Sequence, residues 1–316
     1  MKLNDYGAVF ENIVEKTAKY LVDNNIKAQI LGISGGIDST VVAAICHEVS
    51  KRTNIPLIGR SLPTKFNKEE EISTANLVGK AFCTDYKVAN LNRVYYTFLS
   101  QIMISEKEGT DWDVDNSGNI VRVNTEGFQT PIANGNIQAR LRMIYLYNLA
   151  SIRKGLVMDT DNLTENNLGY FTIHGDVGDF NPIGGLWKTE VFKLAEYLID
   201  FYRMTGQIDR SIAMFNSWSL KPTAGLGITD NDLEEIGAES YEQVDSILKE
   251  ILAWKWLSSE RGETYDSIWD MRHAFLEEQQ IFDTPIKVII AVTDRHFKSE
   301  FKRKQLPIKI TRDEIV

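Results

Sequence analysis

The feature that most constrains this chain is a short apolar run that stops at paired glycines and passes directly into a helix. Residues 28–33 form a predicted buried strand, and a Ser-Gly-Gly turn follows at 34–36. Adjacent glycines permit positive φ and let an anion approach the backbone without meeting a Cβ. The helix that begins near Asp38 adds unpaired N–H groups, and Ser34, Ser39 and Thr40 add hydroxyl donors. The junction is therefore a predicted anion site.

Asp38 narrows the chemistry of that site, because its carboxylate would repel a bare phosphate. A divalent cation that bridges the carboxylate to the phosphates removes the conflict. The segment lacks the Lys-Ser/Thr ending of a Walker A loop and the third glycine of a dinucleotide-binding loop. Ser-Gly-Gly-x-Asp-Ser after a strand resembles the pyrophosphate loop of the N-type ATP pyrophosphatases, whose members cleave ATP between the α and β phosphates. The alternative is a plain strand–turn–helix connection with capping Ser and Asp side chains.

Composition and charge limit the classes of partner and the cellular location expected for the chain. The chain has 316 residues and a net charge of -9, with a pI of about 5.1 and a mean hydropathy of -0.23. This acidity disfavours nonspecific binding to nucleic acid or anionic lipid. No apolar run approaches the roughly 18 residues needed to span a membrane, and the first residues lack the apolar core of a signal peptide. The cysteines, Cys46 and Cys83, are too few for a disulfide framework, so we expect core thiols in a cytoplasmic protein.

Predicted strands and helices alternate through the first half of the chain. This order predicts an α/β fold: a doubly wound parallel sheet flanked by helices, with ligands bound at the carboxyl ends of the strands. We expect one domain over residues 1–316, an inserted hairpin at 106–134, a mainly helical part after Lys188, and a tail at 297–316. The expected strands are 29–33, 56–62, 87–91 and 155–160; the expected helices are 6–21, 38–52, 68–82, 93–104 and 136–152.

Three further segments carry residues suited to chemistry. Thr160 and Glu165 follow the fourth strand, so Glu165 could share Mg²⁺ with Asp38, although an acidic capping turn is the simpler explanation. The loop at 175–182 holds Asp176 and Asp179 and is followed by Lys188, which could neutralise phosphate charge. Arg140 borders the apolar face expected for Ile137, Leu141, Ile144 and Tyr145, and it needs an anionic ligand or a structural salt bridge.

These blocks, taken in order, resemble NAD⁺ synthetase, the enzyme that amidates the nicotinate carboxylate of deamido-NAD⁺. The resemblance runs from Leu31 to about Pro307 and rests on the ordered set rather than on the loop alone. Its parts are 34–39, 135–143, Thr160 with Glu165, 169–172, 175–176, Lys188, 222–223 and 302–303.

The resemblance implies roles residue by residue. It implies ATP as co-substrate, Mg²⁺ on Asp38 and Glu165, and a homodimer with the dinucleotide at the subunit interface. The residues implied to bind ATP are Gly32, Ile33, Ser34, Gly35, Gly36, Ile37, Asp38, Ser39, Thr160, Lys188 and Thr223. The residues implied to bind deamido-NAD⁺ are Arg140, Asp179, Lys302 and Arg303.

The chain departs from the pattern of short bacterial members at a few positions. Ile173 stands where a lysine is usual, Phe301 where a histidine is usual, and Asp159 where a glycine is usual. Ser61 replaces an arginine, although Arg60 lies beside it. The insertion at 106–134 is also longer than usual, and all these departures concern mainly the substrate side.

The chemistry that this resemblance implies begins with transfer of AMP onto the carboxylate, which creates a mixed anhydride and expels pyrophosphate. Ammonia then attacks the acyl-adenylate. We expect Lys188 to stabilise phosphate charge, and Asp176 or Asp179 to orient or deprotonate ammonium. No residues remain for a glutaminase domain, so free ammonia, or ammonia from a separate glutaminase, is the expected donor.

Two rival functions stay open on the sequence. Another adenylating enzyme of the superfamily, such as a GMP-forming or tRNA-modifying synthetase, would share the loop; a tRNA enzyme should be basic. A non-catalytic ATP-binding regulator would have no evident reason to combine Arg140, Glu165 and Lys188.

Overall fold

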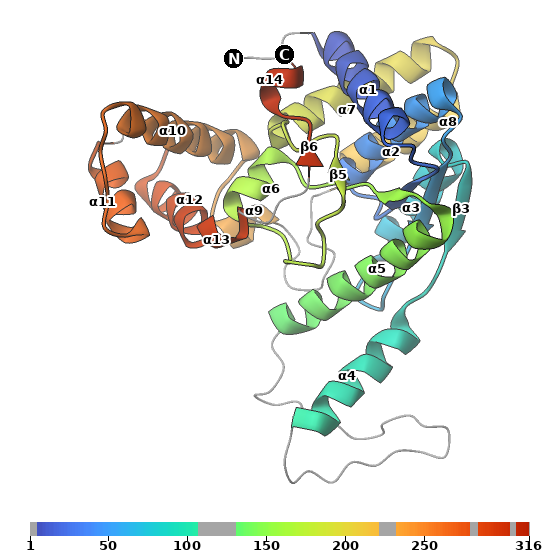
Figure 1. Cartoon of the computed structure of the whole chain (residues 1–316), viewed down its shortest axis with the longest axis horizontal. Helices are drawn as coiled ribbons and strands as arrows, with labels where there is room; N and C mark the ends of the chain where they lie inside the picture. The colour runs from blue at the N-terminus through green and yellow to red at the C-terminus, as the bar shows by residue number, and fades with distance from the viewer. Residues whose placement is uncertain (1–4, 107–130, 221–231, 279–283, 304–307, 316) are drawn as a thin grey trace.

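The computed structural model describes residues 5–106, 131–220, 232–278, 284–303 and 308–315. Its centre is a parallel sheet in the order β3-β2-β1-β4, with the rest of the chain arranged around it (Figure 1). The strands are β1 (Gln29–Gly32), β2 (Leu57–Ser61), β3 (Asp85–Val88) and β4 (Leu156–Val157). In register, Ile30 lies opposite Ile58 on one side and Val157 on the other. The predicted parallel α/β sheet is confirmed.

The first two predicted strands are each one residue too long at an end or at both ends, and the other two differ from the structure by more than one residue. The third begins at Asp85 rather than at residue 87, and it ends before Asn90, whose side chain accepts the Asn92 N–H at the start of the next helix. β4 spans only two residues because the chain then turns toward another segment, where the Asp159 N–H donates to the Phe180 carbonyl. The residues after β4 are thereby free to form a loop at the carboxyl edge of the sheet.

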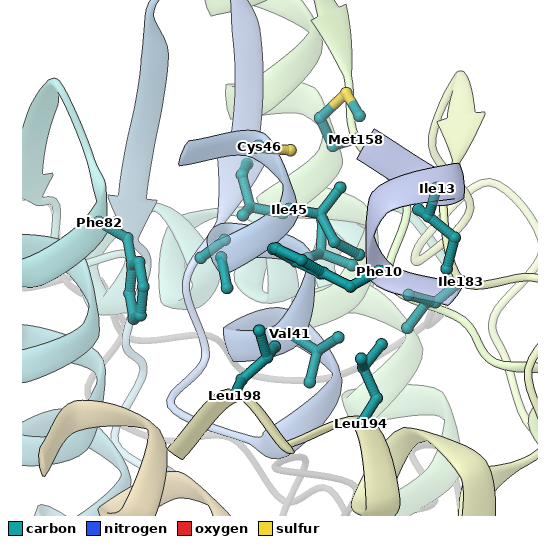
Figure 2. Close-up of a cluster of buried hydrophobic side chains, with 14 of the residues drawn as sticks. Phe10, Ile13, Val41, Ile45, Cys46, Phe82, Met158, Ile183, Leu194 and Leu198 are labelled. Carbon is teal, nitrogen blue, oxygen red and sulfur yellow. The ribbon is translucent and has the colours of Figure 1, made fainter. Parts of the chain in front are cut away.

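Alternation along the strands supplies the two faces of the sheet. Leu31 and Leu57 enter one buried apolar cluster, and their neighbours Ile30 and Ile58 enter another on the opposite face. Figure 2 shows the first cluster, where Val41, Ile45 and Leu198 meet. Its helices are α1 (Tyr6–Asp23), α2 (Ile37–Thr53), α3 (Glu69–Phe82), α7 (Lys188–Met204) and α8 (Ile208–Ser219). The opposite face is covered by α4 (Asn92–Glu106) and α5 (Pro131–Arg153).

Helix α5 corrects two sequence expectations. It begins at Pro131, five residues before the predicted start, since proline suits the first position of a helix. Ile137 and Leu141 are buried as expected, but Ile144 is 63% exposed and does not belong to the buried face. Residues 107–130 of the predicted hairpin lie outside the described part of the chain.

The later helices form a lobe with its own apolar core, seen beside the sheet in Figure 1. They are α6 (Leu163–Leu168), α9 (Asp232–Ile236), α10 (Tyr241–Glu260), α11 (Ile268–Glu278), α12 (Ile286–Lys298) and α13 (Glu300–Arg303). The chain then returns to the body, where β6 (Ile308–Lys309) pairs with β5 (Phe180–Asn181) and α14 (Arg312–Ile315) contacts α1.

Two further expectations concern the cysteines and membranes. Cys46 is fully buried, Cys83 is half-buried, and both are free thiols. Within the described residues, no helix has the length and apolar character required to cross a membrane.

Candidate active site

The glycine turn after β1 has the geometry that the sequence predicts. Gly35 has a φ of +90°, and a Cβ there would lie 2.4 Å from the Glu71 carbonyl oxygen. Gly36 precedes α2 and leaves the helix start without a side-chain cap. The Ser34 and Ser39 hydroxyls lie 2.9 Å apart beside this open helix end. The turn therefore places backbone N–H groups and two hydroxyls at one helix N-terminus, and the Ser39 hydroxyl already donates to the Gly36 carbonyl at 3.0 Å.

Thr40 does not add a hydroxyl to that end. Its Oγ1 lies 2.9 Å from the Gly36 carbonyl oxygen and 2.8 Å from the Ser217 hydroxyl, and the residue is fully buried. Ser217 in turn donates to the Gly35 carbonyl at 2.8 Å. The expected donor role of Thr40 is wrong; it instead ties the loop to α8.

Lys188 connects the two predicted metal-binding carboxylates. Its Nζ lies 2.5 Å from Oδ2 of Asp38 and 3.0 Å from Oε1 of Glu165, and its side chain is only 3% exposed. Burial alone would lower the pKa of Lys188, but the two carboxylates outweigh it and raise that pKa above its usual value. Burial, with Asp38 nearby, raises the pKa of Glu165 to about 7. Sequence segments more than 120 residues apart thus meet in one charge cluster.

Asn162 is a residue of this cluster that the sequence analysis missed. Its amide donates to Oδ1 of Asp38 at 2.9 Å, while its own oxygen accepts the Glu165 N–H at 3.0 Å. Oε2 of Glu165 accepts the Asn162 N–H at 3.1 Å, which completes a capping box at the start of α6. The Asn-x-x-Glu spacing is the sequence signal that could have revealed it.

The donor set fits Mg²⁺ that also binds substrate phosphates. Asp38 and Glu165 already share one cation, the Lys188 ammonium, and both offer hard oxygen ligands. No group of three or more His, Cys, Asp or Glu side chains that could hold a metal occurs in the described part of the chain. Mg²⁺ commonly takes one or two protein carboxylates and fills its other positions with phosphates and water.

The second acidic loop is fastened to the sheet. Oδ2 of Asp176 accepts the Thr172 N–H at 2.6 Å, and Oδ2 of Asp179 accepts the Val157 N–H at 2.9 Å. Desolvation raises the pKa of Asp176 despite its backbone hydrogen bonds. Asp179 thus has a structural bond that holds Val157, the last residue of β4.

Asp159, where a glycine was expected, fastens the same loop from the other side. Its carboxylate is 1% exposed and accepts the Asp161 N–H at 2.7 Å and the Gly178 N–H at 3.0 Å. Burial raises the pKa of Asp159 to about 7. The Asp159 carboxylate therefore joins the loop after β4, which includes Thr160, to the loop that holds Asp176.

Of the basic residues expected near the substrate, Arg140 is exposed, whereas Lys302 and Arg303 are held by backbone carbonyls. Arg140 is exposed, and its Nε donates to the Ile173 carbonyl at 3.4 Å. Lys302 donates to the carbonyls of Gly169 and Phe171 at 2.8 and 2.6 Å. Arg303 donates to the Asn167 carbonyl at 2.9 Å. Lys302 and Arg303 therefore cap the end of α6, whose first turn carries Glu165.

The remaining expected positions either have a visible structural environment or lie outside the described residues. Arg60 is buried and forms a bidentate pair with Asp85, with Nη2 at 3.0 Å from Oδ2, so it is a structural residue. Phe301 is 60% exposed. Thr223 lies outside the described residues. Arg142 of α5 is half-buried and donates to the Asn67 side chain and to the Leu62 carbonyl.

Comparison with known proteins places the chain in a family. The profile of the family described as NAD synthase matches residues 9–306. The chain belongs to the NAD synthase family. It is 30% identical over 307 residues to the NH(3)-dependent NAD(+) synthetase of Methanocaldococcus jannaschii, which covers 96% of this chain and 98% of that protein.

Further relatives agree with this assignment. The NH(3)-dependent NAD(+) synthetase of Methanococcoides burtonii is 32% identical over 242 residues, covering 76% of this chain and 78% of that protein. The structure of NMN synthetase from Francisella tularensis has a TM-score of 0.66 at 23% identity and covers 95% of this chain and 97% of that one. At 23% identity, the similarity to the Francisella tularensis structure bears on the fold alone. The predicted family and fold class are confirmed.

Proposed function

We propose that this protein catalyses the ATP-dependent amidation of deamido-NAD⁺ to NAD⁺ with ammonia, through an acyl-adenylate and with release of AMP and pyrophosphate. The observation that carries the proposal is the Asp38–Lys188–Glu165 cluster beside the open helix end of the Ser-Gly-Gly loop. This arrangement supplies anion-binding N–H groups and cation-binding carboxylates at one place. The family assignment supplies the C–N ligase class.

The charges explain why activation is needed. A carboxylate resists ammonia because it is anionic and its oxide is a poor leaving group. Transfer of AMP makes that oxygen the bridge of an acyl-phosphate anhydride, so that it can leave with AMP when ammonia attacks, while the negative charge on the departing pyrophosphate increases. The loop N–H groups, the Ser34 and Ser39 hydroxyls and the Lys188 ammonium would stabilise this charge.

We assign Mg²⁺ to Asp38 and Glu165. When bound, the ion would neutralise charge on the phosphates of ATP. Lys188 lies against both carboxylates. Its ammonium can therefore bind the protein oxygens before ATP binds and the phosphate oxygens afterwards. Asn162 holds one oxygen of Asp38 and the backbone of Glu165, and it keeps both ligands oriented.

The residues assigned to ATP and to deamido-NAD⁺ are those that the resemblance implies, and for Arg140 the exposure of its side chain agrees. Gly32–Ser39, Thr160 and Thr223 are assigned to ATP. Arg140, Asp179, Lys302 and Arg303 are assigned to deamido-NAD⁺, and the exposure of Arg140 leaves its guanidinium accessible to a carboxylate or phosphate. Asp176 or Asp179 is assigned to orient ammonium, and each uses one carboxylate oxygen to accept a backbone N–H, from Thr172 and Val157 respectively.

We also propose a homodimer built on α4 and α5. These helices pack together, and in Figure 1 they extend away from the lobe. Their outer surface carries apolar side chains that are 45–67% exposed: Val94, Phe98, Ile132, Ile144 and Ile152. Self-association would remove this surface from water and would use the same patch on both subunits.

The proposed nitrogen donor is ammonia. Free ammonia suffices for the chemistry, and a separate glutaminase could deliver it. The reducing environment expected for Cys46 and Cys83 agrees with a cytoplasmic enzyme.

The test is an assay of purified protein with ATP, Mg²⁺, ammonium chloride and deamido-NAD⁺. We expect NAD⁺, AMP and pyrophosphate in equal amounts, and no NAD⁺ when ammonium is omitted. A mononucleotide with the same nicotinate carboxylate serves as the competing substrate. Formation of ADP, or absence of NAD⁺ at every ammonium concentration, would contradict the proposal.

A further inference from the structure

The segment at 308–315 returns to elements that lead into the active site. Its strand β6 pairs in parallel with β5, and the Ile310 N–H donates to the Asn181 carbonyl at 3.2 Å. Helix α14 follows and lies against α1 (Figure 1). Ile310 is 4% exposed and belongs to the same apolar cluster as Val41 and Ile45. The segment is therefore built into the body of the protein.

Strand β5 lies between this segment and the loop after β4. Phe180 pairs with Ile308 on one side and forms a parallel bridge with Met158 on the other. Asn181 is fully buried, and its side-chain amide donates to the Asp161 carbonyl at 2.7 Å. The segment at 308–315 thus supports the loop after β4 through one intervening strand.

Arg312 makes a second connection, to the first turn of α7. Its Nη1 lies 2.5 Å from Oε2 of Glu190 and its Nη2 lies 2.6 Å from Oε1, which makes a forked ion pair. The Glu190 side chain is 8% exposed and the Arg312 side chain 23% exposed. Forked pairs fix the orientation of both groups as well as their separation. Arg312 therefore sets the orientation of the Glu190 carboxylate.

Glu190 in turn fixes the backbone on both sides of Lys188. Its Oε2 accepts the Trp187 N–H at 3.0 Å. The Trp187 carbonyl accepts the N–H groups of Glu190 and Val191 at 2.8 and 2.9 Å. Lys188 lies between these bonded residues, and its own N–H donates to the Thr164 hydroxyl at 2.8 Å. The position of its side chain thus depends on the turn that Glu190 closes.

We propose that Arg312 is a positioning residue for Lys188 and that it acts through Glu190. The inference rests on the proposed function, in which the Lys188 ammonium stabilises charge on the phosphates. That stabilisation depends on the distance between the ammonium and the developing charge, so a small displacement of the lysine lowers the rate. The segment at 308–315 is thereby part of the support of the active site.

The first test measures exchange of labelled pyrophosphate into ATP with deamido-NAD⁺ present and ammonium absent. We expect Arg312→Ala to lower the maximal exchange rate about tenfold or more at saturating ATP, in protein that circular dichroism shows to be folded. Arg203→Ala is the matched control, because Arg203 lies in the last turn of the same helix and pairs with Asp200 at the exposed surface. Its rate should stay within about twofold of wild type.

The second test asks whether the missing group can be supplied from solution. Methylguanidinium ion should restore exchange in Arg312→Ala in a saturable manner, because it can occupy the place of the deleted guanidinium. It should leave the wild-type rate unchanged. It should also fail to restore the double variant Arg312→Ala/Glu190→Ala, which lacks the acceptor.

A milder variant keeps the inference testable if Arg312→Ala does not fold. Arg312→Lys retains the charge but cannot form the forked pair, and its exchange rate should lie below the wild-type rate. A wild-type rate in folded Arg312→Ala or Arg312→Lys overturns the inference. Equal restoration of the single and double variants by methylguanidinium, or restoration of neither, also overturns it. If wild-type protein shows neither exchange nor NAD⁺ formation, the proposed function itself fails.

Discussion

At the scale of single residues, the loop depends on two adjacent glycines whose surroundings differ. Gly35 has φ +90° and a backbone carbonyl where a Cβ would be, whereas a Cβ on Gly36 would meet the Ser34 hydroxyl at an ordinary 3.4 Å. The two neighbouring glycines therefore serve different purposes. Gly35 allows the turn to form, and Gly36 keeps space for the anion.

This difference predicts the behaviour of two alanine variants. Gly35→Ala should lower the free energy of unfolding by about 2 kcal/mol or more, because of the positive φ and the close carbonyl. Gly36→Ala should remain within about 1 kcal/mol of wild type but should lose ATP–pyrophosphate exchange, since its methyl group occupies the approach of the phosphates. Urea unfolding and the exchange assay measure both effects. Equal stability losses for the two variants would contradict the explanation.

His296 gives a residue-scale prediction for pH. It is 1% exposed, and burial, with Arg303 and Lys255 nearby and Glu300 partly opposing them, lowers its pKa to about 3. Between pH 3 and 6.5 the unfolded chain binds the proton and the folded chain does not, so stability falls as the pH decreases through this range. Wild type should lose about 2 kcal/mol more than His296→Gln between pH 7 and pH 5. Parallel pH profiles from urea unfolding would show that His296 is not responsible.

At the scale of elements, the helical lobe is joined to the sheet at the starts of two helices. Asp245 of α10 accepts the Thr164 hydroxyl of α6 at 2.5 Å, and it accepts the Thr189 N–H of α7 at 3.1 Å. The Thr164 hydroxyl also accepts the Lys188 N–H at 2.8 Å. One buried carboxylate therefore fixes the helices that carry Glu165 and Lys188.

Removing this carboxylate should disturb both stability and catalysis. Asp245→Ala leaves two helix starts without their buried acceptor, and we expect a loss of about 3 kcal/mol in the free energy of unfolding. The rate of ATP–pyrophosphate exchange should fall with it, because Glu165 and Lys188 lose their support. Glu250→Ala, an exposed acid on the same helix, is the control and should change neither quantity. A fully active Asp245→Ala protein would contradict the positioning role.

Local patterns allowed the elements to be predicted better than their bounds or partners. The strand–turn–helix unit at Ser34–Ser39 was predictable because a glycine turn and a buried strand are local signals. The exposure of Ile144 was not, since helical spacing cannot tell which of several apolar stripes faces the sheet. Asp245 and Asn162 were also missed, because their roles arise from contacts that join distant segments.

At the scale of the whole molecule, the exposed apolar face of α4 and α5 requires a partner surface. Ile144→Arg should convert the proposed dimer to a monomer, because it places a charge in the middle of the face. Met204→Glu is the matched control: Met204 is 79% exposed and apolar, but it lies at the end of α7. Analytical ultracentrifugation measures both. A monomeric wild-type protein, or a dimer that survives Ile144→Arg, would contradict the proposed interface.

In the proposed reaction, the loop and the charge cluster transfer AMP onto a carboxylate. Deamido-NAD⁺ labelled with oxygen-18 in its nicotinate carboxylate tests that claim directly. In an acyl-adenylate mechanism, one carboxylate oxygen becomes the bridge to the α-phosphorus and leaves with AMP. Mass spectrometry should find one labelled oxygen in AMP for each NAD⁺ formed and none in pyrophosphate. Label in inorganic phosphate alongside ADP, or unlabelled AMP, would contradict the mechanism.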